Sequence, residues 1–448
     1  MFNRDNQEYV EVGTRPDEEG MKAQSRKIDD AIHKITAWRI APILLVSYIA
    51  AHLDRINIGF AKQQMTSDLG FSDTAYGLGA GLFFIAYAVF GVPSSLMLNR
   101  FGPRRWISSI MVVWGILSAA TFMVSTPAQF YVLRLLLGVA EAGFFPGILV
   151  YINRWFPADR RAQITALFAL AVPAAGMIGG PVSGTIIENL HDVGGLRGWQ
   201  WMFLLEGLPV VMVGLWFYMA LPDRVHDAPW LTQAQKDHLV AKLAAETRSE
   251  ANTSLAQCVR DPKVWLLVGI YCAVMLAVNT ISFWMPALIH GAGVASDSKV
   301  GFLSAVPYLL GCVFMIAVGY SSDRLKERRW HLSVPLLMSA AGLIIVGLQP
   351  SSLFLVMVGL VIAGMGASTA LPSFWQLPPA FMAPATLAAG IAFVSSLGSI
   401  ASFFAPYFIG WMRDTTQSAS LALYLLSAFV AAGALLVLRL PASIVNPR

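Results

Sequence analysis

Charged residues are scarce in this sequence. Asp, Glu, Lys and Arg make up only 13% of its 448 residues, whereas 56% of the residues are apolar. An average soluble chain is about a quarter charged, because its surface must face water. The shortage excludes a soluble fold and indicates a protein with many membrane-spanning segments.

Cysteine is almost absent too. Cys258, Cys272 and Cys312 are an odd number, and two of them stand in apolar runs. No disulfide framework can be read from such a set. We expect all three to be inert packing residues.

Several functional signatures are also missing. The sequence has no nucleotide-binding loop, no cluster of metal ligands, no nucleophile elbow and no basic patch interleaved with base-stacking aromatics. We therefore expect no enzyme, no cofactor, no metal site and no nucleic-acid partner. Residues 1–36 lack the short apolar core of a cleaved signal peptide, so the first apolar helix should stay in the membrane as an anchor.

Long apolar runs, in contrast, are abundant. A helix needs about 20 apolar residues to cross a hydrocarbon core of roughly 30 Å. Twelve runs reach this length, which predicts an all-α membrane protein with twelve transmembrane helices in two pseudo-symmetric six-helix bundles. The runs lie near 39–61, 76–98, 106–124, 129–152, 163–190, 201–221, 264–289, 299–320, 332–349, 352–374, 385–410 and 419–440.

The longest polar interruption, between the sixth and seventh runs, divides the chain. Leu239 and Leu243 stand at i, i+4 among charged residues within it, which predicts a short surface helix. We expect an N-terminal cytoplasmic segment at 1–37, a first bundle at 38–221, a cytoplasmic loop at 222–262, a second bundle at 263–440 and a cytoplasmic tail at 441–448.

Lys and Arg are unevenly distributed between the two sides of the predicted helices. The connections on the side opposite the N terminus contain only four basic residues, Lys62, Arg197, Lys299 and Arg413. The segments on the side of the N terminus contain all the remaining Lys and Arg residues counted between the helices. The positive-inside rule then places both termini in the cytoplasm. We expect a multi-pass protein of a bacterial inner membrane.

An internal repeat follows the second and eighth predicted helices. Residues 95–105 (SLMLNRFGPRR) resemble residues 319–329 (GYSSDRLKERR), at an offset of half the chain. Such a repeat indicates a parallel duplication, which places a binding site at mid-membrane between the two halves.

Five further motifs accompany these loops: LDRINIG at 53–59, RLLLGVAEAGFFP at 134–146, RWFP at 154–157, LEG at 205–207 and PSFWQLP at 372–378. Together the loops and motifs resemble the major facilitator superfamily, and within it the anion:cation symporters that import organic carboxylates of the phthalate, tartrate and galactonate type. Asn99 stands where the first loop of that family usually has an acid. The resemblance implies conformational-gate loops containing Arg100, Arg104, Asp323 and Arg324.

Asp54 and Arg55 stand side by side inside the first apolar helix. Each charge costs roughly 2.5 to 3.5 kcal/mol at mid-bilayer, and neighbours on a helix point about 100° apart, so they cannot neutralise each other. On the fourth helix Arg134, Gly138 and Glu141 share one face. We expect Asp54 to pair with Arg134 and Arg55 to face the cavity. Structural ion pairing, and snorkelling of Arg55 to the membrane surface, are the alternatives.

Glu141 has no evident cation in this reading. A buried carboxyl group without one favours its protonated form, so we expect Glu141 to carry a proton. The resemblance likewise implies that Asp54 and Glu141 are the proton-coupling pair, and that Arg55 and Arg134 handle the substrate carboxylate and Asp54. Protonation of both acids would leave two uncompensated arginines and so prepare the site for an anion. A purely structural role for Glu141 is the alternative.

Other candidate residues follow from the same resemblance. Tyr87 and Trp375 match substrate-contacting aromatic residues, with plain packing as the alternative. His52 stands where sugar-acid members often have tyrosine, and its other reading is a helix-interface residue. Ser395 and Ser399 replace the asparagines that the family usually has there, and we count Ser395 among the substrate-binding residues.

Two further acids, Glu188 and Glu206, lie by our count near the outer ends of the fifth and sixth helices. There a solvated or capping role is favoured over proton coupling.

The missing amide side chains bear on the substrate. Hydroxylated sugar acids need many hydrogen-bond partners, because buried hydroxyl groups cost free energy when unpaired. A flat aromatic acid needs a cation, an aromatic wall and little else. We expect a monomeric, proton-coupled importer of a small organic anion, with phthalate-like acids first and tartrate or sugar acids second. A proton-antiporting exporter and a non-transporting receptor are the rival functions.

Overall fold

The computed structural model describes residues 16–247, 260–382 and 384–446. Cys258 and the basic residues at 4, 15, 248 and 448 lie outside these ranges. Within them the secondary structure is helical, and twelve helical spans are long and apolar enough to cross a membrane. This confirms the predicted all-α architecture.

The N-terminal half contains the first six spans. A surface helix, α8 (Gln233–Thr247), follows them, and its position confirms the helix predicted around Leu239. The helices of this half are α1 (Pro16–Leu69), α2 (Asp73–Phe101), α3 (Pro103–Ala120), α4 (Pro127–Glu141), α5 (Phe144–Trp155), α6 (Ala158–Asn189) and α7 (Gly198–Ala220).

The fourth span is broken, although the sequence predicts one helix over 129–152. Helix α4 ends at Glu141, and α5 begins at Phe144. Pro146 has no backbone N–H, so it cannot donate to the carbonyl of Ala142 four residues earlier. The break therefore falls beside Glu141 and leaves this acid at a helix end.

The C-terminal half contains the other six spans. Two four-residue helices, α14 (Pro378–Phe381) and α17 (Ala442–Val445), accompany them. The long helices are α10 (Pro262–Gly291), α11 (Asp297–Leu325), α12 (Arg329–Leu348), α13 (Leu353–Phe374), α15 (Pro384–Thr416) and α16 (Ser420–Leu438).

The two halves repeat each other closely at α2 and α11. Both helices have 29 residues, begin with Asp after a Ser N-cap, and end in the repeated loops. The second loop caps the next helix, since Glu327 accepts hydrogen bonds from the amides of Trp330 and His331. Partial burial raises the pKa of Glu327, but these hydrogen bonds outweigh it and hold the pKa below its usual value.

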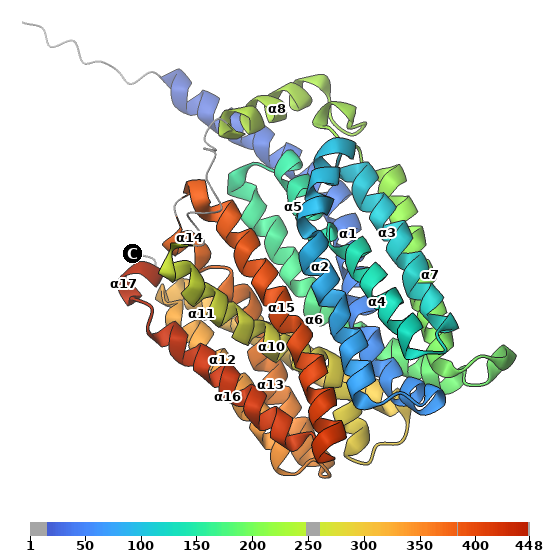
Figure 1. Ribbon diagram of the computed structural model, residues 1–448. Coiled ribbons are helices and arrows are strands. Elements are labelled where there is room, and N and C mark those ends of the chain that lie inside the picture. Colours follow the sequence, from blue (N-terminus) through green and yellow to red (C-terminus); the bar gives the residue numbers. More distant parts are fainter. Residues whose placement is uncertain (1–15, 248–259, 383, 447–448) are drawn as a thin grey trace, which may run out of the picture.

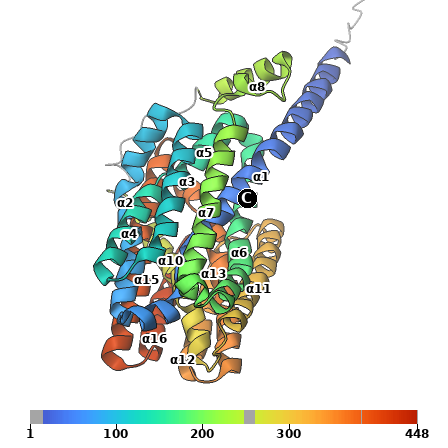
Figure 2. The same cartoon turned by 90° about the vertical axis from the view of Figure 1, so that its right-hand side faces the viewer.

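The halves lie side by side, with α2 against α15 and α6 against α11 (Figure 1). Helix α1 extends beyond the bundle, and α8 lies at the same end (Figure 2). There Asp29 of α1 lies 2.7 Å from Nε2 of His238 and accepts a 3.0 Å hydrogen bond from Lys242. We call this the terminal end. The opposite end, which carries the α1–α2 turn (70–72) and the α10–α11 loop (292–296), is called the closed end.

Glycine brings the two halves into contact towards the closed end. A Cβ atom on Gly77 of α2 would lie 2.3 Å from the carbonyl oxygen of Pro406 in α15. A Cβ atom on Gly301 of α11 would lie 2.1 Å from the carbonyl oxygen of Gly180 in α6. Real Cβ atoms do not approach backbone so closely, so these helices can meet only because both positions are glycine.

Candidate functional site

The central feature of the site is an ion pair between α1 and α4. Arg55 Nε donates to Oε2 of Glu141 over 2.8 Å. The arginine side chain is 24% exposed and the glutamate 1%, so the pair has one accessible and one buried member. The other carboxylate oxygen, Oε1, is buried without a hydrogen-bond partner.

The structure corrects two expectations, that Glu141 has no cation and that Asp54 pairs with Arg134. Asp54 accepts hydrogen bonds from Ser118 Oγ and from Asn57 Nδ2, the latter at 3.4 Å, and forms no ion pair with Arg134 among the described residues. The helical spacing correctly places Arg134 and Glu141 on one face. It does not fix how α1 is rotated against that face, and the actual rotation brings Arg55 to Glu141.

Arg134 lies buried beside the pair, with 2% of its surface exposed. Its guanidinium is 5.0 Å from the ring centre of Phe83, while its Nε and Nη2 atoms have no hydrogen-bond partner. A Cβ atom on Gly138 would lie 2.2 Å from the carbonyl oxygen of Phe83. The glycine thus lets α2 approach α4 and places this aromatic ring over the arginine.

Aromatic rings of the N-terminal half surround Arg55. Its guanidinium carbon lies 5.1 Å from the ring centre of Tyr87 and 5.4 Å from that of Phe83. Tyr48, about two turns before Arg55 on the same face of α1, packs edge-on against His52 with 4.5 Å between the ring centres. The His52 Nδ1 atom lies 3.2 Å from the Tyr48 carbonyl oxygen. Tyr87 therefore lies at the site, while the ring of His52 is held by its own helix.

The C-terminal half adds a second aromatic group. Tyr271 of α10 packs 4.9 Å from Trp375 at the end of α13, and it is close enough to Tyr87 and Arg55 to interact electrostatically with both. Ser395 of α15 is partly buried. The C-terminal half therefore brings one aromatic ring, that of Tyr271, near Arg55.

The predicted gate loops behave differently in the two halves. Arg104 donates to the carbonyl of Tyr218 over 2.6 Å, which ties the first loop to the end of α7. Arg100 lines a cavity at the terminal end, described below. Asp323 and Arg324 in the second loop are exposed.

Glu206 corrects another expectation. It lies eight residues inside α7 rather than near its outer end, and it accepts a 2.6 Å hydrogen bond from Ser183 Oγ. Its Oε2 atom is buried without a partner. The interior of the N-terminal half thus holds a third acid besides Asp54 and Glu141.

A polar network closes the other end of the site. Lys62, which we expected in an outer connection, is 3% exposed and lies inside α1, because α1 continues to Leu69. Its Nζ atom pairs with Asp73 at 2.5 Å, and Arg413 of the other half pairs with the same aspartate at 3.1 Å. Asp73 therefore joins both halves at the closed end.

Two further acids bridge the halves reciprocally. Asp414 of α15 accepts from the amide of Thr74 at 2.7 Å, at the start of α2. Glu188 of α6 accepts from the amide of Ser298 at 2.7 Å, at the start of α11. The capping role expected for Glu188 is thus observed, with a helix of the other half as its target. Among the described residues, every hydrogen bond and ion pair between the halves lies at the closed end.

The sequence signals for the missed residues were weak. Tyr48 is seven residues before Arg55 and so shares its helix face, which could have suggested it. Tyr271 stands in an apolar run with no charged neighbour, and nothing local distinguishes it from a packing residue. The described part of the chain contains no group of three His, Cys, Asp or Glu residues placed to hold a metal ion.

Comparison with known proteins places this geometry in a family. Residues 44–406, and in a second match residues 293–445, fit the family described as Major Facilitator Superfamily. A Pseudomonas putida protein provisionally named metabolite transport protein NicT is 42% identical over 418 residues, which cover 93% of this chain and 96% of that protein. A provisionally named tartrate transporter of Agrobacterium vitis is also 42% identical, over 414 residues that cover 92% of this chain and 91% of the relative.

Solved structures share the fold at low sequence identity. The partially occluded inward open conformation of the xylose transporter XylE from Escherichia coli aligns with a TM-score of 0.70 and 14% identity. The alignment covers 90% of this chain and 98% of that one. At this identity the likeness concerns the fold alone.

Proposed function

Because the chain belongs to the Major Facilitator Superfamily, we propose that it imports a small organic carboxylate together with protons by alternating access. The observation that carries this proposal is the 2.8 Å pair between the accessible Arg55 and the buried Glu141. Glu141 and a substrate carboxylate would compete for Arg55, and this competition couples protonation of Glu141 to substrate binding.

The coupling follows from the charges. While Glu141 is ionised it occupies Arg55, which then has less capacity to bind a substrate carboxylate. When Glu141 is protonated, its ionic interaction with Arg55 is lost, and the planar guanidinium can form a bidentate pair with the substrate carboxylate. Loss of the proton restores the internal pair and displaces the anion. Asp54, which has hydroxyl and amide partners instead of an arginine, is the second proton carrier in this scheme.

The surroundings of Arg55 support an aromatic acid as the first candidate substrate. Tyr87 and Phe83 lie over its guanidinium. In the other half Tyr271 is close enough to interact with Arg55, and Trp375 packs against Tyr271. Aromatic rings stack well on a flat ligand and offer few hydrogen bonds to a polyol. We propose a phthalate-like carboxylate, with tartrate as the second candidate because of the name of the Agrobacterium relative.

The closed end supports the direction of transport. Few basic residues lie in its connections, so we place it outside and both termini in the cytoplasm of a bacterium with this protein in its inner membrane. The described contacts between the halves then correspond to a state sealed to the outside, in which substrate leaves to the cytoplasm. The loops with Arg100, Arg104, Asp323 and Arg324 would seal the opposite end in the other state.

One chain holds the whole site, so we propose a monomer.

Purified protein in liposomes that enclose a pH-sensitive dye tests this function. We expect phthalate to drive proton influx, and tartrate to do so more weakly. In the variant Glu141→Gln, substrate accumulation driven by a proton gradient should fall at least about tenfold, because coupling between two binding sites typically changes affinity by such a factor. Exchange of labelled substrate should continue. Asp237→Asn, on the exposed face of α8, is the matched control.

Uphill accumulation retained by Glu141→Gln would contradict the role of this acid. Proton efflux on adding substrate would indicate an exporter instead. Substrate binding without exchange would indicate a receptor.

A further inference from the structure

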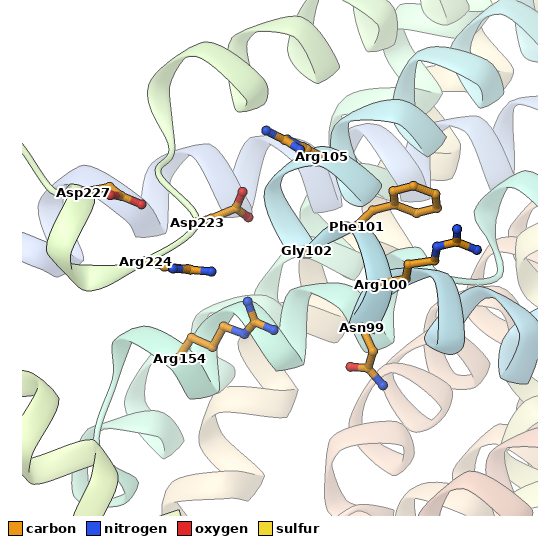
Figure 3. A pocket seen from close by; sticks show the side chains of 9 residues that line it. All are labelled: Asn99, Arg100, Phe101, Gly102, Arg105, Arg154, Asp223, Arg224 and Asp227. Carbon is orange, nitrogen blue, oxygen red and sulfur yellow. The ribbon is translucent and has the colours of Figure 1, made fainter.

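A cavity of about 440 Å³ lies at the terminal end, outside the site described above. It forms where α2 turns into α3 and where α5 and the chain after α7 come together (Figure 3). Its polar lining consists mainly of guanidinium groups. The lining residues are Asn99, Arg100, Phe101, Gly102, Arg105, Arg154, Asp223, Arg224 and Asp227.

The acids of the cavity do not neutralise its arginines. Asp223 accepts a 2.8 Å hydrogen bond from the amide of Arg104 and so serves the start of α3. Gly102 permits this contact through a backbone φ of 82°. Arg154 and Arg224 extend towards this turn in Figure 3. Among the described residues, none of the four lining arginines forms an ion pair.

Four arginines against two aspartates leave a net positive cavity. Like charges so gathered repel one another unless an anion lies among them, and the planar guanidinium matches the oxygen geometry of a phosphate. We propose that this cavity binds a phosphate group, carried either by the headgroup of an anionic membrane lipid or by a soluble phosphate compound.

The place of the cavity favours contact with a bilayer. Helix α2 ends at Phe101, α5 at Trp155 and α7 at Ala220, so the cavity lies where three spans leave the membrane. The lining also includes an apolar ring, since Phe101 is 47% exposed. Basic pockets at such a boundary suit phosphate headgroups, while their openness also admits a soluble anion. A bound phosphate would tie together the ends of α2, α5 and α7.

The test measures the thermal stability of the full chain in detergent with added phosphatidylglycerol, phosphatidylcholine or inorganic phosphate. A ligand that binds the folded state raises the melting temperature. We compare the wild type with the double variant Arg154→Gln/Arg224→Gln. The matched control Arg260→Gln/Arg439→Gln removes the same charge from exposed positions outside the cavity.

We expect phosphatidylglycerol, more than phosphatidylcholine, to stabilise the wild type and the control. The cavity variant should bind it at least about tenfold more weakly, since each lost charged hydrogen bond weakens binding by about that factor. If inorganic phosphate gives the same pattern, the ligand is a soluble phosphate; if only the lipid does, it is a headgroup.

Equal responses of the cavity variant and the control, or no response of the wild type to either ligand, would overturn the proposal. Where the glutamine variant fails to fold, Arg154→Lys/Arg224→Lys keeps the charge and must retain binding above that of the Arg154→Gln single variant. Transport of carboxylate is not the readout, so failure of this proposal and failure of the proposed function are distinguishable.

Discussion

Arg55 combines two surroundings that are usually separate in a membrane protein. Its Nε atom holds the buried Glu141, while the rings of Tyr87 and Phe83 lie over its guanidinium and about a quarter of its side chain is exposed. A planar, delocalised cation can satisfy all these contacts at once. A compact ammonium group cannot, because it has no fork and stacks poorly.

The variant Arg55→Lys tests this distinction. The charge is kept but the bidentate geometry is lost, and hydrogen bonds to charged groups are worth about 1.5 to 3 kcal/mol each. We expect the Kd for the carboxylate, measured by tryptophan fluorescence or scintillation proximity, to rise at least about tenfold. Arg39→Lys, exposed on the same helix, is the control. Unchanged affinity in Arg55→Lys would show that Arg55 supplies charge alone.

At the scale of elements, glycine-lined contacts hold α6 against α11 and α2 against α15. Gly180 and Gly301 face each other so closely that a methyl group on either would overlap the other's backbone. Backbone is far less able to move aside than a flexible side chain. A single added methyl group must therefore separate the helices rather than be absorbed.

The variant Gly301→Ala should consequently disfavour the closed end. We expect spin labels at Ala128 and Ala295, both exposed at that end, to give longer distances between the halves by pulsed electron resonance. Gly319→Ala is the matched control, because it lies on the same helix and an added Cβ atom there would meet nothing within 4 Å. An unchanged distance distribution in Gly301→Ala would refute the idea that these glycines permit closure.

The two reciprocal caps give a second prediction at this scale. Asp414 and Glu188 accept backbone N–H groups at the starts of α2 and α11, and a cap of this kind is worth roughly 1 kcal/mol. Asp414→Ala or Glu188→Ala should each lower the population of the closed end about fivefold, measured with the same labels. Asp192→Ala, which removes an acid paired with Arg197 of its own half, should leave that population unchanged. A shift as large in the control would mean that general charge, rather than capping, matters.

At the scale of the whole molecule, the bilayer explains why so much could be predicted. The required helix length fixes the number of spans, and a duplication marked by one loop in each half fixes the two-bundle fold. The pairing of charges could not be predicted, because helical spacing shows which residues share a face but not how two helices are rotated against each other. Lys62 was misplaced because a lysine near the end of an apolar run resembles the start of a loop. Its partner Asp73 begins another helix.

The orientation in the membrane remains a prediction that reporter fusions can test. Green fluorescent protein fused after Arg448 should fluoresce, since it folds in the cytoplasm, and alkaline phosphatase at the same place should be inactive. Alkaline phosphatase fused after Gln349, in the connection between α12 and α13 at the closed end, should be active. The reverse pattern would invert the proposed direction of transport.

The reciprocal caps also make opening a cooperative event. Asp414 of the C-terminal half caps α2 of the N-terminal half, and Glu188 of the N-terminal half caps α11 of the C-terminal half. A movement of one half relative to the other that separates one of these acids from its helix therefore also displaces the second acid. Rigid rotation of the halves breaks both hydrogen bonds together. A half-open form would lose the free energy of one cap and gain little conformational entropy in return. The closed end should therefore open in a single step, with water entering at α2 and α11 at the same moment.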